Sequence, residues 1–181
     1  LTSRAIEITN QNYSGTQIRD IIKAHNWNIV LGRIDSNIYG TLLSNYDIPL
    51  HIGDKIIVVG TKEELDQVEQ VLGKEAENSL IHDRKEYDIV RIFVSNPDVV
   101  GRELSSLNLQ EKYQTVITRI RRGDIEMLAK GDTILELGDR IRFVARRQDI
   151  KDIQKIFGDS YYAASKVDLF SFGIGLALGL I

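Results

Sequence analysis

Ile52-Gly53-Asp54-Lys55-Ile56-Ile57-Val58-Val59 returns later in the chain as Leu137-Gly138-Asp139-Arg140-Ile141-Arg142-Phe143-Val144. The offset is 85 residues, from Asp54 to Asp139. The same offset holds for the positions that follow each copy: Leu65, Val68, Val71, Leu72 and Gly73 match Ile150, Ile153, Ile156, Phe157 and Gly158. Upstream the offset is 86 residues: Asn10, Gly15 and Arg33 match Asn96, Gly101 and Arg119. Solenoid repeats are about 20–50 residues long, so a longer repeat indicates a duplicated domain.

The composition is that of an ordinary globular protein without cysteine chemistry. The 181 residues are 43% hydrophobic and 27% charged, proportions that support folded cores. No cysteine is present, which excludes disulfides and thiolate metal sites. The net charge of −3 lacks the basic excess of nucleic-acid-binding proteins, so no nucleic-acid partner is expected.

Each copy predicts the same order of strands and helices. Strands rich in β-branched residues are expected near residues 5–8, 28–34 and 38–42 of the first copy, and near 89–94, 115–121 and 125–129 of the second. A glycine precedes an amphipathic helix in both, and a Gly-Asp turn leads into the last strand. The pattern is βαβββα, an α+β fold. Two small helices cover only one face of a four-stranded sheet, so the other face must meet water, the sister module or another subunit.

The domain boundaries follow from the helix that closes the first copy. Thr61 and Glu64 form an N-terminal capping box, and Gly73 stands where a left-handed C-terminal stop is expected. The polar stretch that follows has little periodicity and is expected to be a linker. The expected division is a first module at 1–73, a linker at 74–87, a second module at 88–158, and a connector with the start of a truncated transmembrane helix at 159–181.

The tail predicts contact with a membrane. Residues 169–181 contain no charged residue, although a helix needs about 20 residues to span a bilayer. Gly175 and Gly179 have the small-xxx-small spacing of packed membrane helices. Together with Gly173 they would be costly in a water-exposed helix, at about 1 kcal/mol each relative to alanine. The stretch therefore favours a truncated transmembrane helix over a soluble C-terminal helix.

No catalytic or metal site is predicted. The three histidines, His25, His51 and His82, have no histidine partner at the i+3 or i+4 spacing of a metal site. No nucleophile-elbow motif is present. Asp54 and Asp139 follow glycine at tight turns, where aspartate typically bonds to the backbone. We therefore expect structural turns and no enzymatic activity.

One charge pattern is a candidate anion or ligand site. Arg119 and Arg121 alternate along one predicted strand, and Arg140 and Arg142 alternate along another. Residues two apart share a sheet face. If the two strands are neighbours in register, four guanidinium groups gather on one face, where they can bind phosphate or carboxylate.

The alternative is a solvated sheet face whose arginines are neutralised by Asp124, Glu126 and Glu136. The first copy differs at these places, since it keeps Arg33 and Lys55 but has Asp35 and Ile57 at the other two positions. Any anion site is therefore expected in the second copy.

The repeated unit resembles TrkA-C domains, also called RCK C-terminal domains. The resemblance rests on Gly15 or Gly101 before the first helix and on the closing passage of Gly-Asp, strand, helix and glycine, and it covers residues 4–73 and 88–158. Two such units directly before the stretch 171–179 resemble the AspT/YidE group of bacterial transporters, which includes aspartate–alanine exchangers. In that group, tandem TrkA-C domains lie in the cytoplasm between two membrane halves.

This resemblance implies a regulatory, ligand-sensing module of a multi-pass transporter at the cytoplasmic face of the bacterial inner membrane. Its partners would be its own membrane domain and a second copy of the chain, because small modules bury little surface alone. TrkA-C domains elsewhere regulate potassium channels and transporters, so cation or amino-acid transport is implied. Some bind small ligands such as cyclic di-AMP at a dimer interface. A nucleotide or amino acid is the candidate ligand, no binding residue carries over, and no cofactor is expected.

Two other hypotheses stay open. ACT-like domains are also small α/β units, so the chain could be an amino-acid-sensing pair attached to a soluble enzyme. It could also be a purely structural dimerisation module. A polar continuation after Ile181 would favour the enzyme, and a longer apolar stretch would favour the transporter.

Overall fold

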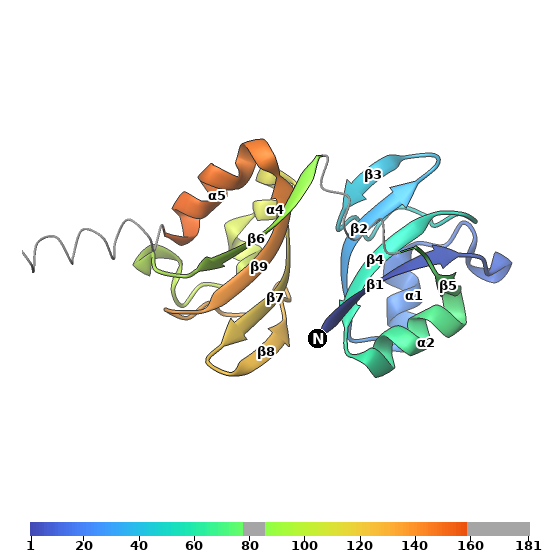
Figure 1. Cartoon of the computed structure of the whole chain (residues 1–181), viewed down its shortest axis with the longest axis horizontal. Coiled ribbons are helices and arrows are strands. Elements are labelled where there is room, and N and C mark those ends of the chain that lie inside the picture. Colours follow the sequence, from blue (N-terminus) through green and yellow to red (C-terminus); the bar gives the residue numbers. More distant parts are fainter. Residues whose placement is uncertain (78–85, 159–181) are drawn as a thin grey trace, which may run out of the picture.

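The computed structural model describes residues 1–77 and 86–158, which form two antiparallel sheets with helices beside each (Figure 1). We call residues 1–77 the first module and residues 86–158 the second module. The expected α+β class is confirmed. The division of the chain into two TrkA-C-like modules stays a prediction.

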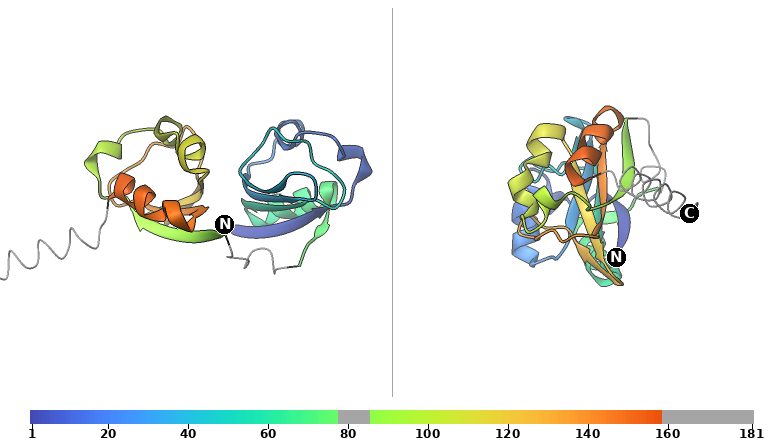
Figure 2. Two further views of the ribbon diagram at one scale, coloured as in Figure 1. Left: turned by 90° about the horizontal axis from the view of Figure 1, so that it is seen from above. Right: turned by 90° about the vertical axis from the view of Figure 1, so that its left-hand side faces the viewer.

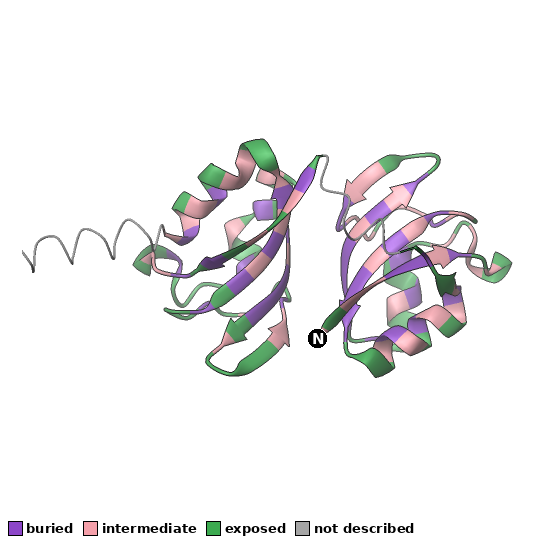
Figure 3. Ribbon diagram, viewed as in Figure 1, coloured by how far each residue is buried: buried purple, intermediate pink, exposed green. Residues whose placement is uncertain are grey.

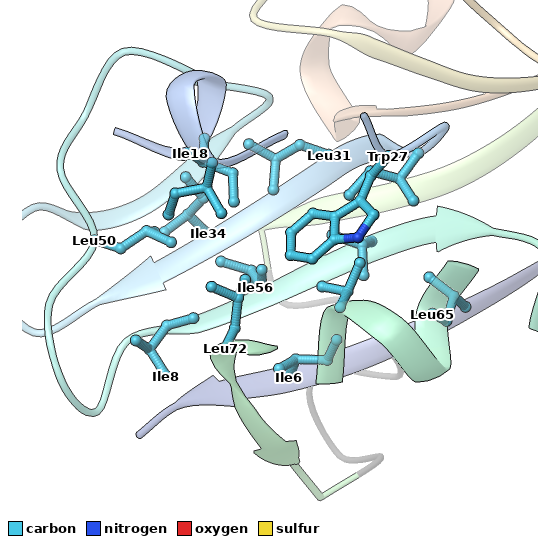
Figure 4. Packing of buried hydrophobic residues seen from close by; sticks show 14 residues of the cluster. Ile6, Ile8, Ile18, Trp27, Leu31, Ile34, Leu50, Ile56, Leu65 and Leu72 are labelled. Carbon is cyan, nitrogen blue, oxygen red and sulfur yellow. The ribbon is translucent and has the colours of Figure 1, made fainter. Parts of the chain in front are cut away.

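The first module contains a five-stranded sheet in the order β3-β2-β4-β1-β5. Its elements are β1 (Thr2–Ile8), η1 (Gln11–Tyr13), α1 (Ile18–His25), β2 (Val30–Ser36), β3 (Gly40–Leu43), β4 (Lys55–Gly60), α2 (Lys62–Leu72) and β5 (Gly73–Glu75). Thr61 caps α2 as expected, since its hydroxyl accepts the Glu64 backbone N–H at 3.3 Å. The apolar stripes of α1 and α2 meet one face of the sheet in a fully buried core around Ile6, Ile56 and Leu65 (Figure 4).

The second module contains a four-stranded sheet in the order β6-β9-β7-β8. Its elements are β6 (Tyr87–Phe93), η2 (Pro97–Val99), η3 (Leu104–Leu107), α4 (Leu109–Tyr113), β7 (Val116–Arg122), β8 (Ile125–Leu128), β9 (Arg140–Arg146), η4 (Arg147–Asp149) and α5 (Ile150–Phe157). The single helix expected after Gly101 is divided into η3 and α4. Asn108 lies between them in the left-handed conformation, with φ 48°, and this interrupts the helix.

The two sheets share their strand order and their irregularity. β6, β9, β7 and β8 occupy the places of β1, β4, β2 and β3. β2 carries a bulge at Gly32, and β7 carries one at Thr118, the position 86 residues later. A bulge inserts one extra residue and shifts the alternation of side chains between the two faces. Val116 and Arg119 therefore share the open face although they are three residues apart.

Gly73 is required by a close backbone approach, and the expected left-handed stop is wrong. Its φ of 163° is extended, and it begins β5, where it pairs with Ile8 of β1. A Cβ here would overlap the Glu7 carbonyl and lie 2.7 Å from the Thr9 backbone nitrogen. β5 thus includes the first residues of the expected linker, and β6 begins at its last residue, Tyr87.

The open faces of the two sheets pack against each other, so the sister module covers the face that the helices leave free. The cluster at this contact consists of Val30, Leu43, Val59, Tyr87, Val116, Leu128 and Val144. Three of its pairs are equivalent in the repeat: Val30 with Val116, Leu43 with Leu128, and Val59 with Val144. β2 contacts β7, and β1 and β6 run along the same side of the pair (Figure 2). Buried positions lie mainly along the strands, whereas the outer surfaces of the helices are largely exposed (Figure 3).

Within residues 1–77 and 86–158, no helix combines the length and apolar character needed to cross a bilayer. The predicted connector and transmembrane start at 159–181 lie outside the described residues, as do residues 78–85 of the expected linker.

Replacing Gly73 by alanine should lower the free energy of unfolding by about 3 kcal/mol, because the new Cβ meets backbone atoms that cannot move without breaking the β1–β5 pairing. Urea denaturation measures the change. Gly32→Ala is the control: its Cβ would lie 3.4 Å from the Ile57 carbonyl oxygen, an ordinary contact, so a change within about 1 kcal/mol is expected. Equal effects of the two substitutions would contradict the close-approach explanation.

Candidate functional site

A cavity of about 610 Å³ lies between the two modules. We call it the inter-module cavity. Residues of the first module in its lining are Ile22, Trp27, Ile29, Val30, Ser44 and Tyr46. Residues of the second module are Leu104, Ser105, Asn108 to Glu111, Thr115 to Ile117, and Ala129 to Gly131. Because both modules build its walls, any ligand bound there would contact both.

The lining follows the internal repeat. Five pairs of equivalent positions face this cavity: Ile22 with Asn108, Ile29 with Thr115, Val30 with Val116, Ser44 with Ala129, and Tyr46 with Gly131. In a two-fold dimer, the same surface of each subunit contributes to the interface. The two modules repeat this arrangement within one chain, because equivalent positions of both modules line the cavity.

The cavity combines apolar walls with a few polar groups, as small-molecule sites commonly do. Ile29, Leu109 and Val116 are buried. At one rim, the Gln110 amide donates to the Ser44 carbonyl oxygen at 2.7 Å, which links the modules. Ser44 itself is buried in the left-handed conformation, with φ 45°.

Tyr46 is a half-buried ionisable group of this cavity. Its hydroxyl accepts the Leu31 backbone N–H at 2.9 Å. Burial raises the pKa of Tyr46 above the ordinary value of 10.0, although the contacts with Leu31 and Ser44 act in the opposite direction. The phenol therefore stays neutral to higher pH than an exposed tyrosine does.

A second cavity, of about 300 Å³, contains all four arginines singled out in the sequence. Its lining is Arg91, Arg119, Arg121, Glu126, Arg140, Ile141 and Arg142, and we call it the arginine cavity. The register places Arg142 opposite Arg119 on one side and opposite Arg91 on the other. Arg91 was missed from the sequence, because the neighbour relation of β6 and β9 has no local signal.

The arginines of this cavity differ in their partners. Arg119 donates to the Ser3 hydroxyl at 2.9 Å and lies 3.6 Å from Glu126. Arg121 lies 3.6 Å from the exposed Asp124 carboxylate. Arg140 lies over the ring of Phe93, 4.6 Å from its centroid. The side chains of Arg91 and Arg142 make no hydrogen bond or ion pair within the described part of the chain.

The neutralised-face alternative therefore accounts for only part of this cluster. Glu136, the third carboxylate of that alternative, binds Arg122 at 2.5 Å instead. Arg122 also reaches Asp139 at 2.8 Å, and Asp139 is 1% exposed. Arg122 was not a candidate, and its role here is to neutralise a buried carboxylate.

The Gly-Asp turns are structural, as expected. Asp54 accepts the His51 backbone N–H at 2.9 Å, and Asp139 accepts the Glu136 backbone N–H at 2.8 Å. Among residues 1–77 and 86–158, no group of three or more His, Asp or Glu side chains could hold a metal ion. His82 lies outside the described residues.

Comparison with known proteins identifies a domain in the second module. The family model described as "TrkA-C domain" matches residues 89–158. An "Uncharacterized transporter GSU1016" of Geobacter sulfurreducens is 43% identical over 164 residues, which are 91% of this chain and 30% of that protein. An "Uncharacterized transporter DIP0830" of Corynebacterium diphtheriae is 38% identical over 181 residues, which are 100% of this chain and 33% of that protein. The chain thus spans about a third of these relatives.

Among solved structures, the RCK C domain of the potassium transport protein KtrA in complex with cyclic di-AMP aligns with a TM-score of 0.39 at 20% identity. The alignment covers 42% of this chain and 91% of that one.

The raised pKa of Tyr46 predicts a loss of stability at alkaline pH. The unfolded phenol loses its proton near pH 10 and the folded one at higher pH, so the folded state holds more protons in between. The free energy of unfolding should therefore fall as pH rises through and above the ordinary tyrosine pKa of 10.0, more steeply than in Tyr46→Phe. Denaturation in urea at a series of pH values measures both slopes. Equal slopes would contradict a raised pKa.

Gln110→Ala should lower the free energy of unfolding by about 1 kcal/mol, because the Ser44 carbonyl loses its donor from the other module. Gln70→Ala, at an exposed position of α2, is the matched control and should change it by less than about 0.5 kcal/mol. Thermal and urea denaturation of both variants measure the difference. If the two variants behaved alike, the Gln110–Ser44 bond would have no role in joining the modules.

Proposed function

Because a TrkA-C domain is present at residues 89–158, we propose that the chain is the regulatory, ligand-sensing part of a membrane transporter. The observation that carries this proposal is the inter-module cavity, whose walls come from both modules at equivalent positions. Relatives named as transporters, which are about three times as long as this chain, support the link to transport.

The proposed mechanism is a shift between two arrangements of the modules. The modules are joined by a small apolar cluster and by a few polar contacts such as Gln110 to Ser44. A ligand that fills the cavity better in one arrangement stabilises that arrangement by its difference in affinity. The change would reach the membrane part through the segment after Gly158, where we place the start of a transmembrane helix at 169–181.

The finer assignments are part of the same proposal. We assign the parent protein to the AspT/YidE group, with the chain at the cytoplasmic face of the inner membrane and the transport of a cation such as potassium, or of an amino acid, as its activity. We regard both modules as TrkA-C-like, at residues 1–73 and 88–158. A homodimer would form through the helix surfaces, since the open sheet faces already contact each other within the chain.

Ligand sensing can be tested with a matched pair of serine substitutions. Ser105 lines the inter-module cavity and the neighbouring Ser106 does not, and both are exposed. The chain is screened by thermal shift against nucleotides, including cyclic di-AMP, and against amino acids. A ligand that binds the native state raises the melting temperature by mass action. Ser105→Phe should abolish that rise because its ring enters the cavity, and Ser106→Phe should retain it.

A ligand response that survives Ser105→Phe would place sensing elsewhere and overturn the role of this cavity. The absence of any response across the panel would favour the structural dimerisation module over the sensor. Binding of amino acids alone, together with a parent protein that carries an enzyme domain, would favour the amino-acid-sensing alternative.

A further inference from the structure

We infer that the arginine cavity is a second binding site, distinct from the inter-module cavity, for a small soluble polyanion that carries phosphate or carboxylate groups. Five arginines and one glutamate line it, which gives a net formal charge of +4 within about 300 Å³. No residue is shared between the linings of the two cavities. The site therefore does not depend on the proposed function of the other cavity.

Three of the arginines stand in a row across neighbouring strands. Arg91 of β6 is opposite Arg142 of β9, and Arg142 is opposite Arg119 of β7. Side chains directly opposite on antiparallel strands have Cβ atoms about 5 Å apart, and like charges there destabilise the sheet. Arg121 and Arg140 form a second opposed pair next to this row. An anion between these side chains would convert the repulsion into attraction.

Arg119 gives the site a buried and prearranged donor. It is 7% exposed, and its terminal nitrogens bind the Ser3 hydroxyl and the Leu1 carbonyl oxygen of the first module at 2.9 Å and 2.8 Å. Its Nε has no hydrogen-bond partner, although it is buried. A buried N–H without an acceptor costs about 1–3 kcal/mol, more for a charged group. A ligand oxygen in the cavity would supply the missing acceptor.

The protein itself supplies too little negative charge. Burial lowers the pKa of Arg142, the positive charges of Arg119 and Arg91 lower it further, and Glu126 opposes them only in part. Glu126 is also the only carboxylate that lines the cavity within the described part of the chain. The balance of charge is therefore completed by an anion from outside the protein.

The equivalent face of the first module does not repeat this arrangement. Its counterparts of Arg91 and Arg142 are Ala5 and Ile57, which are opposite each other in the same register. Arg33, the counterpart of Arg119, binds Asp35 at 2.9 Å. The cluster is thus specific to the second module and is not required by the fold, which favours a binding role.

The chemistry of the cavity selects the ligand class. Guanidinium groups bind the paired oxygens of phosphate and carboxylate in a bidentate manner. A volume of about 300 Å³ admits a small molecule, and Arg119 is covered by the first module, so an extended membrane surface does not fit. Arg91, Arg121 and Arg140 are exposed and form the entry side. Binding should therefore weaken with added salt.

The test is a thermal-shift titration of the whole chain with pyrophosphate and with citrate, against sodium chloride of matched ionic strength. The probe should raise the melting temperature by roughly 3 °C or more near saturation. Arg91→Gln/Arg142→Gln should lose most of this shift. The matched control, Arg19→Gln/Lys55→Gln, removes the same charge from the first module and should keep it.

The melting temperature without ligand provides a second readout. In Arg91→Gln/Arg142→Gln it should be unchanged or higher, because like-charge repulsion is relieved. A clear decrease would show that the row is structural and would overturn the inference. It would also be overturned if neither probe exceeded chloride, if the double variant kept the shift, or if the chain bound anionic phospholipid vesicles without responding to either probe.

Discussion

Within residues 1–77 and 86–158, each sheet has helices on one face only, and the rest of the structure depends on how the second face is covered. An antiparallel sheet tolerates water on one face, but here that face carries valines and leucines. Val30 and Val59 of the first module meet Val116 and Val144 of the second, so each module covers the apolar part of the other. The contact uses equivalent residues on both sides, which explains why a duplicated unit could fold as a pair.

The bulges at Gly32 and Thr118 determine what each open face presents. Without the extra residue, Val116 and Arg119 would point to opposite sides of the sheet. With it, the first part of β7 contributes to the apolar contact and the second part contributes arginines beside it. The inter-module cavity lies at one region of this shared face and the arginine cavity at another. Both candidate sites are thus consequences of the same packing of sheet on sheet.

Much of this organisation could be predicted from the sequence, because it depends on local signals. The internal repeat predicted the same order of strands and helices along both copies, Gly-Asp marked the turns, and alternation placed Arg119 and Arg121 on one face. The remaining features depend on contacts between distant segments. β5 is a strand because Gly73 approaches Glu7 closely, and Arg91 joins the cavity because β6 pairs with β9. The inter-module cavity has no sequence motif, since its lining is assembled from two modules.

The covalent linkage of two modules allows an asymmetry that a pair of identical chains does not. In a two-fold dimer, both halves of an interface carry the same residues, so every site on the axis is symmetric. Here Ile22 and Tyr46 stand opposite Asn108 and Gly131 in the same cavity. On the adjoining face, Ala5 and Ile57 replace Arg91 and Arg142. The second module can therefore carry a cluster of arginines without a second set of like charges facing it from the first module. The first module instead supplies the Ser3 hydroxyl that holds Arg119 in place.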